Sequence, residues 1–560
     1  MTENVSTEDF ASATHAAALK LDGSLESVGF DSGSADHRPT RRIAAYGQNH
    51  YALIDSPAPD DSGSYPALQS LGLPPLPSKP LPTMHVFHAP DLAGLLDAID
   101  SGHSAAPAQP IAPTHPRVAF ACEPAALPAK RRIAHKLVEQ AQATPSAALL
   151  LSRARACVRE SLDAAFPLMR ARARVRGTLG GVAAAAAAKG IDLAKLSPLI
   201  HAFTQRSAGS VYFRHEAMEG EVAAVHASGA SIYQGAGLAL IQAVPSLVHD
   251  IGANDAGTHL AWLGDTDFRP SNRDLLVSTA FLSLAHANAT RRIGFRPHAA
   301  FGLSIGEHSA LVAHGVEVKD IRSIVAPDIC TVHLGGESRA VESYFSRIGV
   351  TGSRWANYFV LASVEELLPI LATETAVWIT VRISPTQLMV SGEASACREV
   401  VKRFGPLRAF PLPLTLALHC PVVRECEDIW KSCCLTFARE SRVTEGRSAT
   451  GVRFYSNALN ASYHVTHQSF AEAYTAQAVA TVDFPTTILQ AWEDGVRIFV
   501  EHGPRSVCTG AITETLGDLP HAAVSLDQFG RSSVTQFADA VAQLIVAGVP
   551  LDLAALEETT

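Results

Sequence analysis

The 560-residue sequence lacks a net positive charge, because 45 Lys and Arg residues stand against 54 Asp and Glu residues, a formal net charge of -9. Proteins that live on nucleic acid need a basic surface, so this balance argues against nucleic-acid binding. The sequence also lacks a long apolar run. The run of small uncharged residues 180–188 is too short and too rich in alanine to cross a bilayer. We therefore expect no membrane span.

The N-terminus lacks the basic start and apolar stretch of a secretory signal. The nine cysteines are therefore expected to be reduced, in the cytoplasm. Their spacing lacks the paired Cys-x-x-Cys knuckles of structural zinc. The cluster Cys420, Cys426, Cys433 and Cys434 is better explained by buried thiols that act as small apolar side chains.

The length predicts about three or four compact units. Residues 1–82 read as a disordered leader, because eight prolines fall between Pro57 and Pro82. Residues 83–219 read as an α/β and helical linker domain, with strands near 84–87 and 117–121 and helices near 91–99 and 131–142. Seven arginines between Arg153 and Arg176 form either a solvated helix face or a landing surface for an acidic partner. From Gly220 onward, apolar strands alternate with helices, which indicates a mostly parallel sheet.

The stretch with the clearest chemical content is Gly302-Leu303-Ser304-Ile305-Gly306, the Gly-x-Ser-x-Gly of this chain. It stands between an apolar, strand-like run and an amphipathic helix. A serine on such a tight strand-to-helix turn is exposed on a sharp elbow, and the glycines permit close backbone approach. The pattern therefore predicts a nucleophilic serine, although ordinary turns match the same pentapeptide.

Four blocks support this interpretation, in the following order: Val225 to Gly237; Gly302 to Glu307; Ser391-Gly392-Glu393 with Leu418-His419-Cys420-Pro421; and Val482-Asp483-Phe484 with Gly495 to Pro504. Together they resemble the acyltransferase domains of fatty acid and polyketide synthases, the malonyl-CoA:acyl carrier protein transacylase family. The resemblance covers about residues 220 to 516. Val211 to Arg214 and Trp355 to Tyr358 are similar to segments of the polyunsaturated fatty acid synthase acyltransferases.

The resemblance implies an α/β fold in which an α/β-hydrolase-like parallel-sheet subdomain carries an inserted ferredoxin-like subdomain, preceded by the small α/β linker domain. The expected boundaries are 220–374 for the first part of the large subdomain, 375–418 for the insertion, and 419–560 for the second part with a C-terminal tail. An acyl group would move from acyl-CoA, or from acyl carrier protein, through a serine ester to an acyl carrier protein thiol, in polyketide or polyunsaturated fatty acid biosynthesis. Other synthase subunits are further possible partners. The resemblance implies no metal or redox cofactor.

Residue by residue, the resemblance implies that Ser304 is the nucleophile and His419 its base. Gln477 would orient His419 through its backbone carbonyl, which leaves Nε2 free to deprotonate the serine. The amides of Ile305 and Gly229 would form the oxyanion hole. Gly229 replaces a glutamine of the family pattern, but a backbone amide survives that change.

The sequence departs from the family in its substrate pocket. Leu303 stands where the family usually has histidine, and the segment Ile324 to Ile329 lacks the arginine that pairs with a malonyl carboxylate in malonyl-specific members. Leu416 and Leu418 make the wall beside His419 apolar. We therefore expect uncharged acyl chains to be preferred over malonyl, unless an arginine from elsewhere, such as Arg339 or Arg382, supplies the charge.

Two other functions stay open at this point. A thioesterase-like hydrolase would use the same serine with water as the acceptor, for editing or off-loading. A catalytically degenerate docking scaffold would explain the altered block at Val225 to Ala230 and the missing arginine, but the intact Ser304, His419 and Gln477 count against it.

Overall fold

The computed structural model describes residues 43–46, 49–52, 81–105, 109–142, 206–229, 231–248, 251, 271–314, 333–351, 354–440, 451–517 and 519–559. The leader predicted over residues 1–82 lies outside this set, apart from residues 81–82 and an antiparallel pair of strands, β1 (Ile43–Tyr46) and β2 (Asn49–Ala52). The seven arginines between Arg153 and Arg176 and the segment Ile324 to Ile329 also lie outside the described residues.

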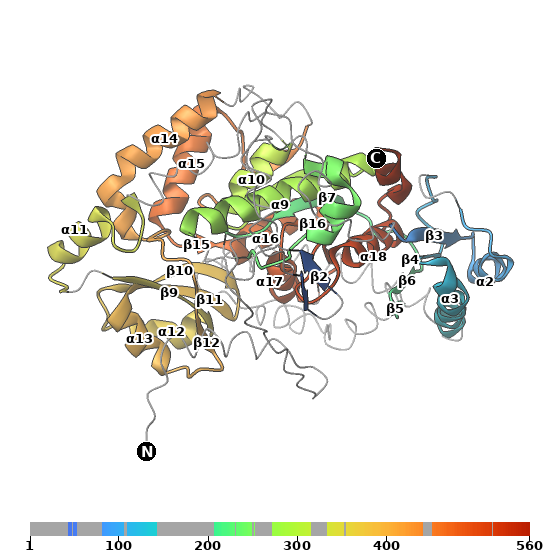
Figure 1. Ribbon diagram of the computed structural model, residues 1–560, viewed down its shortest axis with the longest axis horizontal. Coiled ribbons are helices and arrows are strands. Elements are labelled where there is room, and N and C mark those ends of the chain that lie inside the picture. The colour runs from blue at the N-terminus through green and yellow to red at the C-terminus, as the bar shows by residue number, and fades with distance from the viewer. Residues whose placement is uncertain are drawn as a thin grey trace, which may run out of the picture. The chain divides into compact units, whose positions relative to one another are not determined.

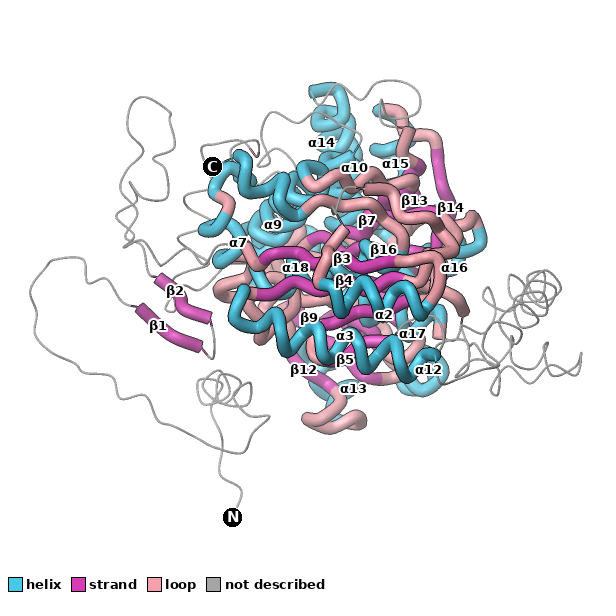
Figure 2. Tube along the Cα trace, turned by 90° about the vertical axis from the view of Figure 1, so that its right-hand side faces the viewer, coloured by secondary structure: helices cyan, strands magenta, loops and turns pink. Residues whose placement is uncertain are grey.

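The first described α/β unit is built on a four-stranded antiparallel sheet of order β3-β4-β6-β5. Helices α2 and α3 pack together on one face of this sheet (Figure 2). Asp91 caps the start of α2, and Gly102 ends that helix in the left-handed conformation. The two strands and two helices predicted after Thr83 are therefore present. The bounds are β3 (Thr83–His88), α2 (Leu92–Ser101), β4 (Arg117–Cys122), η2 (Pro124–Ala126), α3 (Leu127–Gln142), β5 (Arg206–Ala208) and β6 (Val211–Arg214).

The second sheet has six strands in the order β14-β13-β8-β7-β16-β17. Every neighbouring pair is parallel except β13 with β14. The central strands are buried on both faces, so their residues are apolar in near-continuous runs, as parallel sheets require. The bounds are β7 (Glu221–His226), β8 (Ala299–Gly302), β13 (Arg453–Ser456), β14 (Ala461–Tyr463), β16 (Val496–His502) and β17 (Ala522–Ser525).

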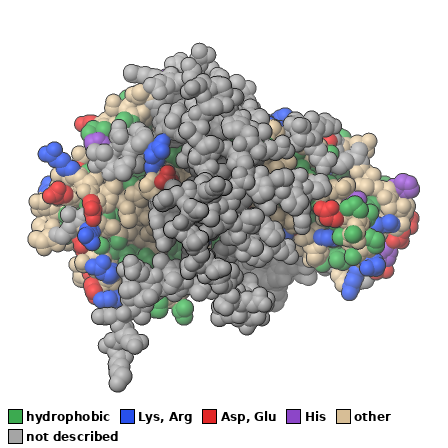
Figure 3. Space-filling model, viewed as in Figure 1, with side chains coloured by type: hydrophobic (Ala, Val, Ile, Leu, Met, Phe, Trp, Pro, Cys, Tyr) green, Lys and Arg blue, Asp and Glu red, His purple; other side chains and the backbone are tan. Residues whose placement is uncertain are grey.

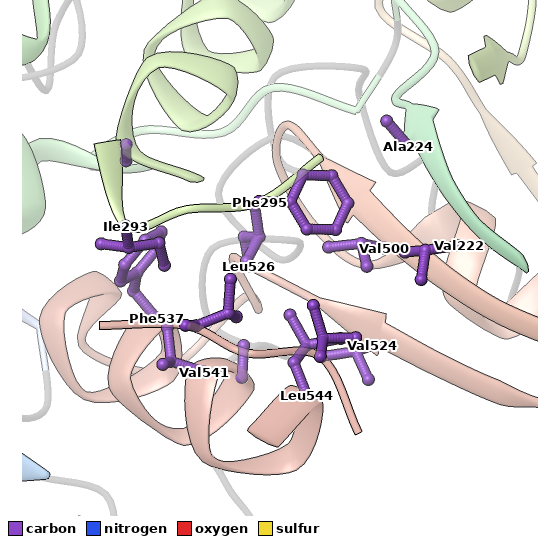
Figure 4. Close-up of a cluster of buried hydrophobic side chains, with 14 of the residues drawn as sticks. Val222, Ala224, Ile293, Phe295, Val500, Val524, Leu526, Phe537, Val541 and Leu544 are labelled. Carbon is purple, nitrogen blue, oxygen red and sulfur yellow. The ribbon is translucent and has the colours of Figure 1, made fainter. Parts of the chain in front are cut away.

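Helices cover both faces of the six-stranded sheet. On one face, Val222, Val500 and Val524 meet Phe537 and other side chains of α18 (Figure 4). On the other face, the alternate residues of the same strands pack against α16 and α17. The bounds of these and the neighbouring helices are α7 (Leu238–Ala243), η3 (Pro245–Val248), α9 (Asn272–Arg292), α10 (Ile305–His314), α16 (Phe484–Glu493), α17 (Val507–Leu516), α18 (Ser533–Ala547) and η7 (Leu553–Thr559).

The third sheet has five strands in the order β12-β9-β11-β10-β15, and only β15 runs parallel to its neighbour. Helices α12 and α13 cover one face (Figure 1). The insertion predicted over 375–418 contains β10 to β12, whereas β9 and α12 lie before residue 375. Because β9 pairs with both β11 and β12, this sheet begins at Trp355. The bounds are β9 (Trp355–Leu361), α12 (Val364–Leu371), β10 (Val377–Ser384), β11 (Gln387–Glu393), α13 (Ala394–Lys402), β12 (Ala409–Pro411) and β15 (Val482–Asp483).

The remaining described helices are α11 (Arg339–Arg347), η6 (Pro421–Cys426), α14 (Glu427–Glu440) and α15 (His467–Val479). Basic and acidic side chains are interspersed on the face of the molecule that Figure 3 shows. Lys402 and Glu399 of α13 form an exposed ion pair. Among the described helices, none is both long and apolar enough to cross a membrane. The prediction of a mixed α/β fold is confirmed.

Candidate active site

The sharp turn between β8 and α10 carries Ser304. The serine has a φ of +57°, in the left-handed region that non-glycine residues seldom adopt. A Cβ on Gly302 would lie 2.2 Å from the backbone carbon of Gly306, and a Cβ on Gly306 would lie 2.2 Å from the carbonyl oxygen of His226. Both positions therefore require glycine. The Gly-x-Ser-x-Gly pattern forms the strand-to-helix elbow that the sequence predicts.

His419 meets Ser304 across 115 residues of chain, with 2.7 Å between His419 Nε2 and Ser304 Oγ. The other ring nitrogen, Nδ1, lies 2.8 Å from the backbone carbonyl oxygen of Gln477 on α15. A carbonyl oxygen only accepts, so Nδ1 carries the proton and Nε2 is left to accept from the serine hydroxyl. The structure thus brings together the three residues that the resemblance selects.

The environment of His419 keeps its imidazole neutral. The side chain is 4% exposed, and burial lowers its pKa to about 4, although the hydrogen bond to Gln477 acts in the opposite direction. At neutral pH the ring therefore carries a proton on Nδ1 only, and Nε2 is a hydrogen-bond acceptor. Its backbone φ of +59° is also left-handed, so both members of the Ser304 and His419 pair are held in an uncommon conformation.

Gly229 and Ile305 lie side by side next to Ser304. A Cβ on Gly229 would lie 3.4 Å from Ile305 Cγ2 and 2.3 Å from Leu276 Cδ2 of α9. Among the turns, loops and helix caps that the structure describes, no backbone carbonyl accepts a hydrogen bond from the N–H of Gly229 or of Ile305. The structure therefore places both residues beside Ser304, where the resemblance expects the oxyanion hole.

The three leucines expected in the pocket separate into two places. Leu416 is 2% exposed and belongs to the cluster that includes Leu276 and Ile305, and Leu418 is half-buried against the same cluster. Leu303 is 1% exposed and lies in a different cluster, on the α16 and α17 side of the sheet. Leu416 and Leu418 therefore adjoin the helix of the elbow, whereas Leu303 supports the elbow from the core.

Of the two arginines named as substitutes, Arg382 is paired with Asp483 at 2.5 Å, and Arg339 is exposed at the start of α11. Sequence analysis missed a third arginine, Arg273, in the first turn of α9. Its Nε is buried without a hydrogen-bond partner among the described residues. It stands three residues before Leu276, so the two side chains are neighbours on the helix. The sequence offers no motif for Arg273, because only packing brings α9 beside Gly229.

His226, His308 and Cys420 lie near the site and are packed in the core. His226 is buried and stacks on His502, with ring centroids 5.1 Å apart, and His308 is buried beside Tyr474. Burial raises the thiol pKa of Cys420 to about 12. Among the described residues, no group of three or more His, Cys, Asp or Glu side chains has the geometry to hold a metal ion.

Sequence comparison identifies relatives of this chain, although no protein-family model matches it. One polyunsaturated fatty acid synthase polypeptide of Thraustochytrium sp. is 26% identical over 280 residues, which are 49% of this chain and 9% of that protein. A second polypeptide of a polyunsaturated fatty acid synthase from the same organism is 24% identical over 294 residues, 49% of this chain and 14% of that protein. The chain is a sequence relative of polyunsaturated fatty acid synthase subunits. It spans only a small fraction of the length of these relatives.

Solved structures that are similar to part of this chain include the acyltransferase domain from the second module of the salinomycin polyketide synthase. That structure has a TM-score of 0.47 and 20% identity, and the match covers 68% of this chain and 83% of that one. FabD from Acinetobacter baumannii has a TM-score of 0.45 and 17% identity, with 59% of this chain and 99% of that one covered.

Proposed function

We propose that this chain is an acyltransferase that moves an acyl group from a thioester to the thiol of an acyl carrier protein through an ester on Ser304. The observation that carries the proposal is the contact of Ser304 Oγ with His419 Nε2 on a glycine-flanked elbow, with His419 Nδ1 held by the Gln477 carbonyl. We also propose that the six-stranded sheet is an α/β-hydrolase-like subdomain and that β9 to β12 form a ferredoxin-like one. The β-α-β-β-α-β order of the latter supports this description.

The first half-reaction forms the acyl-enzyme. His419 Nε2 takes the proton of Ser304 Oγ while Oγ attacks the thioester carbonyl carbon. The negative charge that develops on the carbonyl oxygen is stabilised by the N–H groups of Gly229 and Ile305. The carbon–sulfur bond then breaks, the proton on Nε2 passes to the departing sulfur, and an ester on Ser304 remains.

The second half-reaction transfers the acyl group. The thiol of the carrier protein gives its proton to His419 Nε2, and its sulfur attacks the ester carbonyl. Oγ leaves and recovers the proton, so the enzyme returns to its starting state. Acyl-CoA is a substrate here, and these steps use no metal or redox group. The relatives are synthase subunits by name, which supports a carrier protein and other synthase subunits as partners.

The acyl group that the site accepts is proposed to be uncharged. The residues beside His419 are apolar, with Leu416 buried and Leu418 half-buried. A carboxylate desolvated against such a wall without a cation is costly. Arg382 already pairs with Asp483, which removes one of the two substitutes considered from the sequence.

Intact-mass spectrometry after incubation with a panel of acyl-CoAs tests the proposal. We expect one acyl group to be added to the wild-type chain and none to Ser304→Ala. Because Ser304 has a φ of +57°, the matched variant Ser304→Gly removes the hydroxyl and also accommodates this backbone conformation. An adduct of unchanged yield on either variant would contradict the proposal.

The same measurement separates the alternative functions. An acyl-enzyme that turns over in water without a carrier protein would indicate a hydrolase. A wild-type chain that never acquires an acyl group from any donor, while it remains folded, would indicate a docking scaffold. Transfer of the added mass to a carrier protein is the result we expect.

A further inference from the structure

A buried carboxylate beside the elbow is not used in the steps above. Glu307 lies in the first turn of α10, three residues after Ser304, and is 4% exposed. No Lys or Arg side chain of the described residues pairs with it. Burial raises its pKa, and its hydrogen bonds oppose that change. Burying a carboxylate costs free energy, and hydrogen bonds to its oxygens offset that cost.

Three N–H groups from two other parts of the chain converge on Glu307 Oε2. The side-chain Nε2 of Gln477 donates to it at 2.6 Å. The backbone N–H and the side-chain Nδ2 of Asn457 donate to it at 3.0 and 2.9 Å. One oxygen atom thus joins α10 to the turn after β13 and to α15, whose donors Asn457 and Gln477 lie 150 and 170 residues after Glu307.

These bonds continue directly to the reacting groups. Gln477 presents its backbone carbonyl to His419 Nδ1 while its side chain is held by Glu307. Asn457 Nδ2 also donates, at 2.7 Å, to the carbonyl oxygen of Gly302, which ends β8 just before the elbow. Glu307 is therefore bonded to the residue that orients the base and to the residue that braces the nucleophile turn.

We infer that Glu307 is a positioning residue for acyl transfer, which holds the carbonyl of Gln477 against His419 Nδ1 and the elbow against the turn at Asn457. This inference rests on the proposed function. Without Glu307, three buried N–H groups lose their acceptor, and the Gln477 side chain loses its hydrogen bond to α10. A displacement of about 1 Å at reacting groups is enough to cost about 10²-fold in rate.

Single-turnover acylation by acyl-CoA measures this role. We expect Glu307→Ala to lower the acylation rate about 10- to 100-fold while the half-saturating concentration of acyl-CoA stays within about 2-fold. Glu307→Gln keeps one acceptor oxygen for the three N–H groups, so it should restore most of the rate. The matched control is Glu514→Gln, because the Glu514 carboxylate also accepts several hydrogen bonds, from Ser384, Thr386 and Gln387 on the five-stranded sheet. That control should acylate at the wild-type rate.

Two further readouts distinguish positioning from a general loss of stability. The hydrogen-bonded Nδ1–H proton of His419 should give a downfield NMR resonance in the wild type and in Glu514→Gln, and the resonance should be lost or shifted in Glu307→Ala. Gln477→Met removes the side-chain bond but keeps the backbone carbonyl. If Glu307 acts through Gln477, the double variant should be slower than the single variants by much less than the product of their effects.

Several results would overturn the inference. One is a wild-type acylation rate for Glu307→Ala, and another is a loss that multiplies fully with that of Gln477→Met. If Glu307→Ala does not fold, a wild-type rate for Gln477→Met has the same meaning. An acyl adduct that persists in Ser304→Ala contradicts the proposed function, whereas an inactive Ser304→Ala beside a fully active Glu307→Ala contradicts only the role of Glu307.

Discussion

Replacement of His419 is the most direct test of the proposed chemistry. His419 Nε2 lies 2.7 Å from Ser304 Oγ, within reach of the proton that it must take. Loss of a general base lowers a rate by about 10²- to 10⁴-fold. At about 1.36 kcal/mol for each factor of ten, this corresponds to about 3 to 5 kcal/mol of transition-state stabilisation. We expect His419→Ala to lose acylation by this amount.

The backbone at His419 calls for a second variant. Its φ of +59° lies where an alanine is strained by about 1 to 2 kcal/mol, whereas asparagine is tolerated there. His419→Asn should therefore lose as much activity as His419→Ala while it keeps more of the free energy of unfolding. Equal rates from two variants of different stability would assign the loss to the missing imidazole.

The pH dependence of the acylation rate also tests the role of His419. Because burial lowers the pKa of His419 to about 4, the imidazole is a free base throughout the neutral range. The single-turnover acylation rate, followed by rapid quenching and intact-mass spectrometry, should therefore be insensitive to His419 protonation between about pH 6 and pH 8. It should fall only as the pH approaches 4. An acid limb near pH 6.5 would contradict the buried environment that the structure assigns to this ring.

His308→Ala is the control for the His419 variants, because His308 is buried on α10 against Phe470 and Tyr474, whereas Ser304 Oγ is hydrogen-bonded to His419. It should lower the thermal midpoint but not the acylation rate per folded molecule. The reasoning is refuted if His419→Asn acylates at a near wild-type rate while a change at His308 or His226 abolishes the reaction.

Two more predictions follow from burial and charge. Denaturant unfolding should show a stability that rises from pH 4 to about pH 6.5, because burial lowers the pKa of His286 to about 3 and of His419 and His502 to about 4. Below pH 6.5 the unfolded chain binds protons on these rings that the folded chain does not, at up to about 1.36 kcal/mol per pH unit for each ring. Burial also lowers the pKa of His308 and His314 to about 3 and the pKa of His226 well below its usual value, which adds to the same effect. Burial raises the pKa of Glu501 to about 7 and raises the pKa values of Glu307 and Asp527, so these three acids act in the opposite direction against six histidines. A stability that falls over this range would contradict the burial argument. In competition between acetyl-CoA and malonyl-CoA, kcat/KM should be higher for acetyl-CoA, because the wall beside His419 is apolar. A preference for malonyl-CoA would refute this argument. If Arg273→Ala abolishes that preference, Arg273 is the cation that binds the malonyl carboxylate.

Local patterns were enough to predict the elements that carry the proposed chemistry. The elbow at Ser304 is readable because close backbone approach leaves room only for hydrogen at Gly302 and Gly306. No spacing rule selects one histidine among the 23 of this chain. The pairing of Ser304 with His419 was therefore predicted from the family resemblance of four ordered blocks of sequence. Apolar strand-like runs that alternate with helical stretches likewise predicted the mixed α/β fold before any contact was known.

The start of the five-stranded sheet was not readable in this way. β9 begins with the segment Trp355 to Tyr358, whose resemblance to the synthase acyltransferases does not tell which sheet it joins. It belongs with β11 and β12 because the three strands pair. The two-residue strand β15 joins the same sheet from about 100 residues away, through its pairing with Val381 and Arg382. Strand pairing between distant segments depends on how the whole chain packs, so the boundary at residue 375, expected from the resemblance, lies between β9 and the strands that pair with it.

The surroundings of the reacting groups were decided by tertiary structure alone. Glu307 is part of a motif by sequence, but its bonds to Asn457 and Gln477 join residues 150 and 170 positions apart. The low pKa of His419 and the approach of α9 to Gly229 likewise come from packing, not from neighbouring residues. The sequence by itself determined which side chains are able to react. Burial and long-range hydrogen bonds, which exist only in the folded chain, decided their protonation, their orientation and the residues that hold them.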